Sequence, residues 1–185
     1  MTATPMKRMN PDEMPDELKQ VWSTLQGLTG DATFVEVFAQ APELLDFVMR
    51  QFYGEIFFSG RVDERYKQLA RLRLSQLHGC RTCNKQNVPG AMAAGFTEAQ
   101  VQAMESPTTE HFTEAELAVI AFAEQVALTN HDGKMDEALY ARLSAHFSEA
   151  EICELGTVMA VISGMAKLSF VMQLVEREDY CVFAA

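Results

Sequence analysis

The chain has 185 residues, of which 48% are hydrophobic and 22% charged, so it has the composition of one globular domain and not that of a disordered chain. Its net charge of −11 at pH 7 disfavours nucleic acid and anionic membrane surfaces as main partners. Residues 9–13 are polar where a signal peptide would need an apolar segment, and the longest apolar stretch, 155–166, is too short to span a bilayer. We therefore expect a cytoplasmic protein that binds neither nucleic acid nor a membrane.

Residues 1–16 contain three prolines in a polar, Met-rich context, which predicts an irregular N-terminal arm. From residue 17 to residue 185 almost every segment has helical periodicity, and no segment alternates apolar and polar residues for long enough to predict a strand. We predict a single all-α domain over 17–185. Its helices are expected at about 42–58, 63–78, 80–94, 114–129, 136–145 and 149–175.

One short sequence motif occurs three times and predicts three helix starts, at 95–101, 111–117 and 146–152. In each, Thr or Ser is the expected N-cap, and a Gln or Glu three residues later can close a capping box. A Phe just before the N-cap can pack onto an apolar residue in the first turns of the helix. Because every residue has a capping role, the repeat is structural, and His111 and His146 are predicted to be surface residues and not ligands.

The last predicted helix, 149–175, is apolar on nearly all sides. This pattern indicates a helix that is buried on most sides, in the core or in an oligomer interface. Gly156, Ala160 and Gly164 lie four residues apart on one face, where small side chains would let another helix approach closely.

Cys80-Arg81-Thr82-Cys83 is the motif that could carry chemistry, because two thiols three residues apart can exchange electrons by forming and breaking a disulfide. Asp63 is the expected N-cap of the preceding helix, and Gly79 is its expected end. Cys80 then lies where the next helix begins. Backbone N–H groups and the positive end of the helix dipole at that place would lower the pKa of a thiol.

The segment from 61 to 85 contains seven Lys or Arg residues and only two acidic residues, which leaves a local excess of five positive charges in an acidic chain. Any one of these residues could simply be solvated on a helix face. Together they would add to the positive potential beside the thiols.

The cysteine pair has three possible interpretations. A zinc site would need four ligands, and Cys80, Cys83 and His78 supply only three. A permanent structural disulfide is disfavoured in the cytoplasm, so we favour a redox-active dithiol and expect no metal and no cofactor. The other two cysteines stand alone: Cys153 is predicted to be a buried small hydrophobic residue and Cys181 a tail residue.

The segment from Gln68 to Cys83, followed by Ala91-Met92-Ala93-Ala94-Gly95-Phe96-Thr97, resembles the core of the carboxymuconolactone decarboxylase and alkylhydroperoxidase D (AhpD) superfamily. The resemblance rests on the order helix, Gly-Cys-x-x-Cys, helix, Ala-Gly, and it extends from about residue 42 through the final helix. It implies an AhpD-like helical bundle and assembly into homo-oligomers (dimers, trimers or hexamers). It also implies thiol-dependent reduction of hydroperoxides by the cysteine pair.

The chain departs from that family at the proton relay. In the peroxidase branch a Glu lies twelve positions before the first Cys and a His four positions after the second. Here these positions hold Gln68 and Asn87, whose amides cannot act as general bases near neutral pH. His78 is the nearest titratable substitute, with a carbonyl cap as its alternative role. Pro89 predicts a kink or a restart of the cysteine helix, which would make Asn87 a cap.

The sequence therefore predicts a thiol redox enzyme that reduces a small peroxide or disulfide and receives electrons from a thiol donor. The resemblance favours Cys83 as the attacking thiol and Cys80 as the resolving thiol, whereas the helix terminus favours Cys80 as the more acidic thiol, so the order stays open. The alternative is a non-redox member of the family. It would be a lyase acting on a small lactone, or an oligomeric binding protein.

Overall fold

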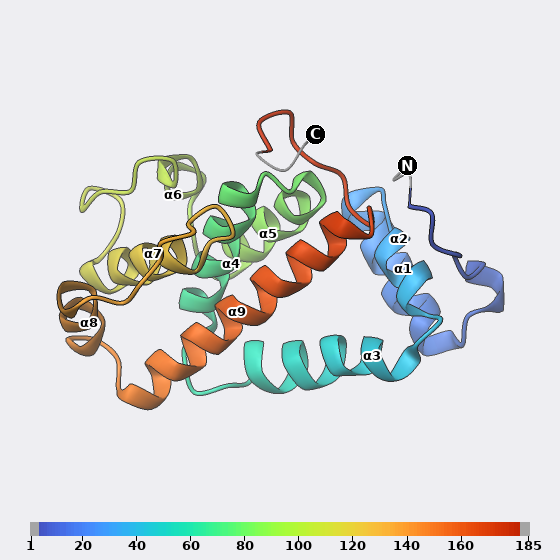
Figure 1. The fold of residues 1–185 in the computed structure, drawn as a ribbon, viewed down its shortest axis with the longest axis horizontal. Coiled ribbons are helices and arrows are strands. Elements are labelled where there is room, and N and C mark those ends of the chain that lie inside the picture. Colours follow the sequence, from blue (N-terminus) through green and yellow to red (C-terminus); the bar gives the residue numbers. More distant parts are fainter. Residues whose placement is uncertain (1–3, 182–185) are drawn as a thin grey trace.

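The structure, a computed structural model, describes residues 4–181, and these form helices with no strand among them (Figure 1). The elements in chain order are η1 (Pro11–Glu13), α1 (Asp16–Thr29), α2 (Thr33–Phe38), α3 (Pro42–Asp46), η2 (Phe47–Phe57), α4 (Glu64–His78), α5 (Arg81–Ala93), α6 (Glu98–Ala103), α7 (Glu114–Val126), α8 (Glu137–Ser144) and α9 (Glu149–Val171). The all-α prediction is confirmed.

The predicted helix ends agree closely with the structure at the cysteine motif. The Asp63 side chain accepts a hydrogen bond from the Arg65 backbone N–H, so Asp63 is the N-cap of α4. Gly79 ends α4 with a φ of +62°, a conformation that glycine adopts without a steric penalty. The predicted helix over 42–58 is α3 running directly into η2, which is a π-helix. The last helix ends earlier than predicted, at Val171.

All three predicted capping boxes are present, at Thr97, Thr113 and Ser148. The phenylalanine that precedes each cap is buried in the main hydrophobic core. His146 is exposed, as predicted, and His111 is half-buried. The three copies of this sequence motif determine where α6, α7 and α9 begin.

The prediction that Pro89 restarts the cysteine helix is wrong. Helix α5 continues through Pro89 to Ala93. Asn87 is not a cap, because its side-chain amide donates to the backbone carbonyl of Arg71 (3.3 Å) and thereby ties α5 to α4. One missing backbone hydrogen bond is tolerated in a helix that is held in this way by its neighbour.

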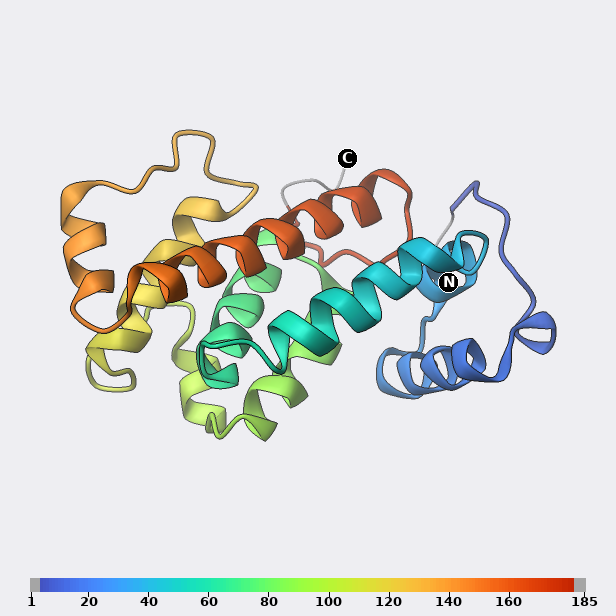
Figure 2. The same cartoon turned by 90° about the horizontal axis from the view of Figure 1, so that it is seen from below.

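Helix α4 lies at the centre of the fold, where it packs against α5, α7 and α9. Figures 1 and 2 show α9 running along the length of the molecule, with α1 and α2 at one end and α6, α7 and α8 at the other. The largest core cluster joins α4 to α7 and α9, and a second cluster joins α1 and α2 to the last turns of α9. The arm that includes η1 also packs here, since Met14 is buried in the second cluster.

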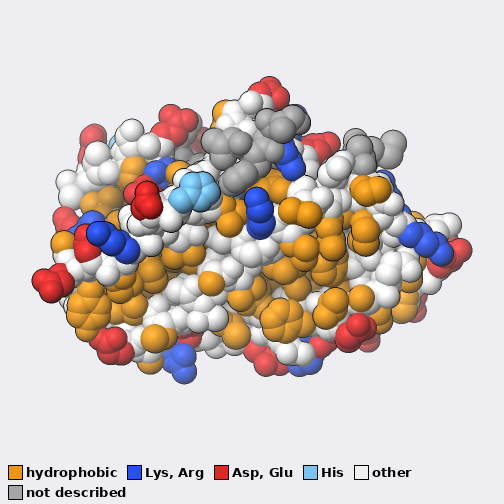
Figure 3. Space-filling model, viewed as in Figure 1, with side chains coloured by type: hydrophobic (Ala, Val, Ile, Leu, Met, Phe, Trp, Pro, Cys, Tyr) orange, Lys and Arg blue, Asp and Glu red, His pale blue; other side chains and the backbone are white. Residues whose placement is uncertain are grey.

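Helix α9 is less buried than predicted. One face packs on α4, α7, α8 and η2, but Cys153, Ala160, Gly164 and Val171 are exposed on the other. Figure 3 shows hydrophobic side chains gathered on the side of the molecule where α9, α3 and η2 lie. Within the described part of the chain, α9 alone is long and apolar enough to cross a membrane by length and composition, a test that core helices also pass. The alternative prediction, an oligomer interface on α9, stays a prediction.

Candidate functional site

Cys80 and Cys83 form a disulfide at the start of α5, with their Cα atoms 5.2 Å apart. Cys80 is the N-cap of α5 and is fully buried, and its Sγ accepts a hydrogen bond from the backbone N–H of Cys83 (3.3 Å). Cys83 lies in the first turn and is half-buried. Residues 4–181 contain no group of three His, Cys, Asp or Glu side chains arranged to hold a metal ion.

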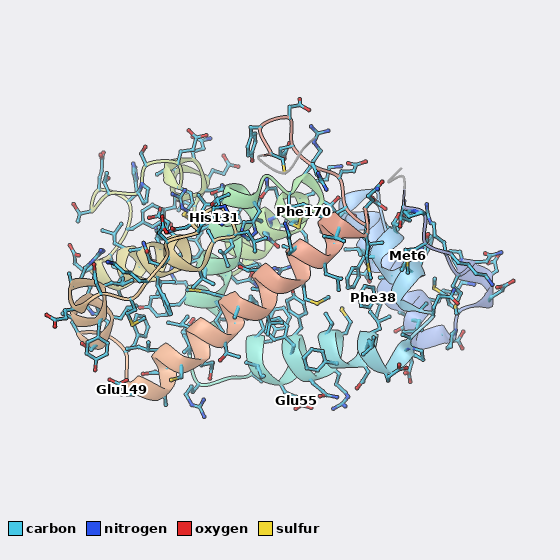
Figure 4. All side chains as sticks on the ribbon, in the orientation of Figure 1. Met6, Phe38, Glu55, His131, Glu149 and Phe170 are labelled. Atoms are coloured by element: carbon cyan, nitrogen blue, oxygen red, sulfur yellow. A yellow bond between two sulfur atoms is a disulfide. The ribbon has the colours of Figure 1, made fainter. Side chains whose placement is uncertain are left out.

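Residues 175–181, which we call the C-terminal strap, cover the turn between α4 and α5. The backbone N–H of Glu178 donates to the Gly79 carbonyl (2.8 Å), and that of Glu176 donates to the Thr82 hydroxyl (2.8 Å). Arg177 donates to the Phe170 carbonyl (3.0 Å), and Figure 4 shows Phe170 in the last turns of α9, close to the start of the strap. Sequence reasoning missed the strap, because nothing periodic marks a pairing between residues nearly a hundred positions apart.

The basic segment around the cysteines is largely neutralised by carboxylates. Six of its seven basic side chains form ion pairs, some with acidic residues of the strap. These pairs are Arg61 and Lys67 with Glu154, Arg65 with Glu116, Arg73 with Glu124, Arg81 with Glu178 and Asp179, and Lys85 with Glu176. The excess of positive charge expected beside the thiols is thus mostly cancelled. The helix N-terminus remains as a source of positive potential.

His78 lies in the last turn of α4 and is almost fully buried, at 1% exposure. Burial lowers its pKa to about 4, so the ring is neutral at pH 7. Its Nε2 accepts a hydrogen bond from the backbone N–H of Leu128 (3.0 Å), which places the proton on Nδ1. His78 is therefore arranged as a hydrogen-bond donor through Nδ1 and not as a base that could deprotonate a thiol.

The two family relay positions have different surroundings in the structure. Asn87 lies one helical turn beyond Cys83, and its buried Oδ1 has no hydrogen-bond partner within the described residues. Gln68 is also buried, but its amide donates to the Glu64 carboxylate (2.9 Å) and packs beside Gly90. Only Asn87 of these two lines the cavity described next.

A cavity of about 330 Å³ adjoins the disulfide. Most of its wall is apolar and comes from α1, η2 and α9, with side chains such as Leu25, Val48, Phe52, Tyr53 and Met165. The polar groups in its lining include Asp31, Arg71, Ser75, His78, Thr82 and Asn87, and both Cys80 and Cys83 line it. A largely apolar hollow with a few polar groups is typical of a small-molecule site. Sequence reasoning found the cysteines, His78 and Asn87, but not the wall, because its residues come from distant helices.

The prediction that Cys153 is buried is wrong, and Cys181 lies in the C-terminal tail as predicted but is buried there. Cys153 is exposed on α9, whereas Cys181 is buried in the strap and donates from Sγ to the backbone carbonyl of His78 (3.1 Å). The apolar sequence around Cys153 did not reveal which side of α9 faces solvent. A tail position gave no sign that Cys181 packs against the α4–α5 turn.

Residues 42–125 match the family model described as the Carboxymuconolactone decarboxylase family. One similar solved structure is a protein of unknown function from Agrobacterium tumefaciens, which is named for an antioxidant defence role of the AhpD type. Its sequence is 22% identical, the TM-score is 0.63, and the match covers 73% of this chain and 91% of that chain. A second is an uncharacterised peroxidase-related protein from Ralstonia eutropha JMP134 with an alkylhydroperoxidase AhpD core. It is 14% identical with a TM-score of 0.70, and the match covers 96% of this chain and 95% of that chain. A third is a variant of the debrominase Bmp8, solved in complex with 2,3,4-tribromopyrrole. It is 18% identical with a TM-score of 0.74, and the match covers 97% of this chain and 95% of that chain.

The family match contains the cysteine pair, and the structural likeness extends over nearly the whole chain. The fold is therefore all-helical and AhpD-like. The family match over residues 42–125 and the AhpD-like fold agree with the resemblance to the carboxymuconolactone decarboxylase and alkylhydroperoxidase D superfamily that the sequence predicted. Because these structures are less than 25% identical to the chain, they carry the fold, and the activity has to be argued from the residues.

Proposed function

We propose that the chain is a thiol redox enzyme in which Cys80 and Cys83 alternate between a dithiol and a disulfide while reducing a small peroxide or disulfide. The observation that carries this proposal is the bonded cysteine pair at a helix N-terminus, in the wall of a largely apolar cavity. The names of two relatives, an AhpD-type antioxidant protein and a peroxidase-related protein, support the same chemistry.

Cys83 is the better candidate for the first attack, because it is half-buried while Cys80 is fully buried. The Cys83 thiolate would attack the terminal oxygen of a hydroperoxide, which breaks the O–O bond, releases an alcohol and leaves a sulfenic acid on Cys83. Cys80 would then attack that sulfur, forming the disulfide and releasing water. An external thiol donor would return the two electrons by thiol–disulfide exchange.

Proton transfer limits the peroxidase version of this proposal. Asn87 has no titratable proton near neutral pH, and the Nε2 lone pair of His78 is occupied by the Leu128 N–H. We therefore expect slow turnover with hydroperoxides. Exchange with a small disulfide depends less on a relay, because its leaving group is itself a thiolate that needs little help from an acid.

Three further expectations belong to this proposal. We expect the electron donor to be a thiol, the protein to act in the cytoplasm, and the chain to assemble into a homo-oligomer. Gel filtration with light scattering would measure the last of these directly.

The proposal is tested by reducing the protein, removing the reductant and adding cumene hydroperoxide or a small disulfide. Mass spectrometry should show the reversible loss of two thiols assigned to Cys80 and Cys83. Cys83→Ser should abolish hydroperoxide consumption, and Cys153→Ser, at an exposed cysteine away from the cavity, should leave it unchanged. Full hydroperoxide turnover by Cys83→Ser would remove the peroxidase version, and inert Cys80 and Cys83 would favour the non-redox alternative.

A further inference from the structure

Arg71 is the one basic residue of the 61–85 segment that forms no ion pair or side-chain hydrogen bond within residues 4–181. It lies in the middle of α4, is 6% exposed and lines the cavity beside the disulfide. Its guanidinium carbon is 5.2 Å from the centre of the Tyr53 ring and 5.6 Å from that of Phe57.

A buried guanidinium without a counter-ion is costly, because water and carboxylates normally solvate its five N–H donors. The faces of two neutral rings attract the cation but accept none of those hydrogen bonds in full. The other six basic residues of the segment show that carboxylates are within reach of this part of the fold. Arg71 is left with its hydrogen-bonding edge available at the cavity wall.

We propose that Arg71 binds the anionic group of a small organic acid whose ring-sized apolar body fills the cavity. A planar guanidinium matches a carboxylate through two parallel hydrogen bonds, a geometry that lysine cannot provide. The body would lie against Val48, Phe52 and Tyr53, close to both cysteines. The inference names a substrate class for the proposed redox site and in that respect rests on the proposed function, but the binding itself does not require redox chemistry.

Asp31 is the second charged group in the cavity lining, and it limits the ligand to one negative charge. Its Oδ1 accepts from the backbone N–H of Thr33 (2.9 Å), while its buried Oδ2 has no partner within the described residues. It lies within electrostatic reach of Arg8, whose pKa is raised mainly by its hydrogen bond to Glu36 and further by the Asp31 charge. Asp31 forms no ion pair with Arg71 within the described residues, so it leaves the N–H donors of the guanidinium available, and its charge would repel a second negative charge on the ligand.

The test is calorimetry of the oxidised wild-type protein with 2-naphthoate and with its neutral isostere 2-naphthamide. We expect the naphthoate to bind about tenfold more tightly, the effect of one added charge-assisted contact. Arg71→Met should remove this preference. Arg142→Met removes the same charge from an exposed helix position and should retain it. Equal affinities in the wild type, or a preference that survives Arg71→Met, would overturn the proposal.

The comparison of the two ligands on the wild-type protein decides the question even if Arg71→Met does not fold. Arg71→Lys adds a second check, since it keeps the charge but loses the paired hydrogen bonds, and we expect it to retain only part of the preference. All of these titrations are made without peroxide or reductant. Binding that depends on Arg71 while the cysteines prove inert would contradict only the proposed function, whereas active cysteines without that binding would contradict only this inference.

Discussion

His78 is a buried neutral residue, and its folded-state pKa of about 4 lies below the value of about 6.5 expected in the unfolded chain. Between these two values the unfolded state binds more protons, so the free energy of unfolding decreases as the pH falls from 6.5 to 4. The expected loss from this residue is about 3 kcal/mol. Urea denaturation at pH 7 and pH 4 would measure it.

His78→Gln keeps an acceptor for the Leu128 N–H but has no titration in this window. Its free energy of unfolding should therefore change less between the two pH values than that of the wild type. His146→Gln, at an exposed position, is the matched control and should behave as the wild type. Equal pH dependence of His78→Gln and the wild type would show that His78 is not the group responsible.

Asn87 occupies the relay position that reaches the cavity, so Asn87→His tests whether a missing base limits the chemistry. We expect this single change to raise the rate of hydroperoxide reduction by about tenfold or more, because general base catalysis contributes at least that much. Stopped-flow measurement of Cys83 oxidation against pH would also reveal a new titration. An unchanged rate and an unchanged pH profile would show that residue 87 does not reach the attacking thiol.

Gln68 is less suited to replacement by the residue that the family has at its position, a glutamate. Its amide donates to Glu64 at 2.9 Å, so Gln68→Glu would bring two carboxylates together in a buried place. One of them would then hold its proton to a higher pH, and the protein would lose stability. The pair Gln68→Glu with Asn87→His should gain little over Asn87→His alone, as paired rate and unfolding measurements would show.

At the scale of the elements, the turn between α4 and α5 depends on glycine for two reasons. Gly79 has a φ of +62°, and an added Cβ would lie 2.6 Å from the Cα of Cys181 in the strap. Gly30 has a similar φ of +75° but open space around it. Gly30→Ala should therefore cost about 1 kcal/mol from backbone strain, and Gly79→Ala about 3 kcal/mol from strain together with the clash.

Urea denaturation would compare the two alanine variants. If the strap detaches instead of straining, Gly79→Ala should make the Cys181 thiol reactive towards a thiol reagent, and Gly30→Ala should not. Similar stability of the two variants together with an unreactive Cys181 would mean that the strap does not press on Gly79.

Most helix boundaries could be predicted from the sequence, because they are set by local chemistry. Asp63, Thr97 and Thr113 cap their helices through their own side chains, and Gly79 ends α4 through its own backbone freedom. Predictions failed where a distant contact decides the outcome. Pro89 stays inside α5 because α4 holds that helix, and the exposed face of α9 depends on which helices lie against it.

At the scale of the whole molecule, one carboxylate joins three parts of the fold. Glu154 of α9 accepts hydrogen bonds from the backbone N–H groups of Arg61 and Val62 (both 3.0 Å) and pairs with Lys67 of α4 (3.3 Å). Lys67 also donates to the Ile56 carbonyl in η2 (2.9 Å), and both ionic side chains are buried. Breaking such a pair leaves one buried charge without compensation.

Glu154→Gln should therefore lower the free energy of unfolding by about 3 kcal/mol. The double variant Lys67→Met with Glu154→Gln removes both charges and should lose clearly less than the sum of the two single variants. A double-mutant cycle in urea measures this difference. Additive losses would mean that Lys67 and Glu154 do not stabilise each other.

The candidate site shows the same division between local and distant information. The spacing of Cys80 and Cys83 predicted the reactive motif, and the family resemblance pointed to residue 87. The neutralisation of the basic segment by ion pairs could not be predicted, because the carboxylates that pair with Arg81 and Lys85 come from the strap. The isolation of Arg71 follows only from knowing where all of those carboxylates lie.

The strap has a further consequence for the order in which the protein is made. Glu178, which holds the strap to Arg81, follows it by 97 residues, so the ribosome completes both cysteines long before their cover exists. Since chains are extended at about 5–20 residues per second, the two thiols spend several seconds in a nascent chain whose strap has not yet been synthesised. Once the pair has emerged from the ribosome, it therefore lacks the cover that the strap gives it in the finished protein.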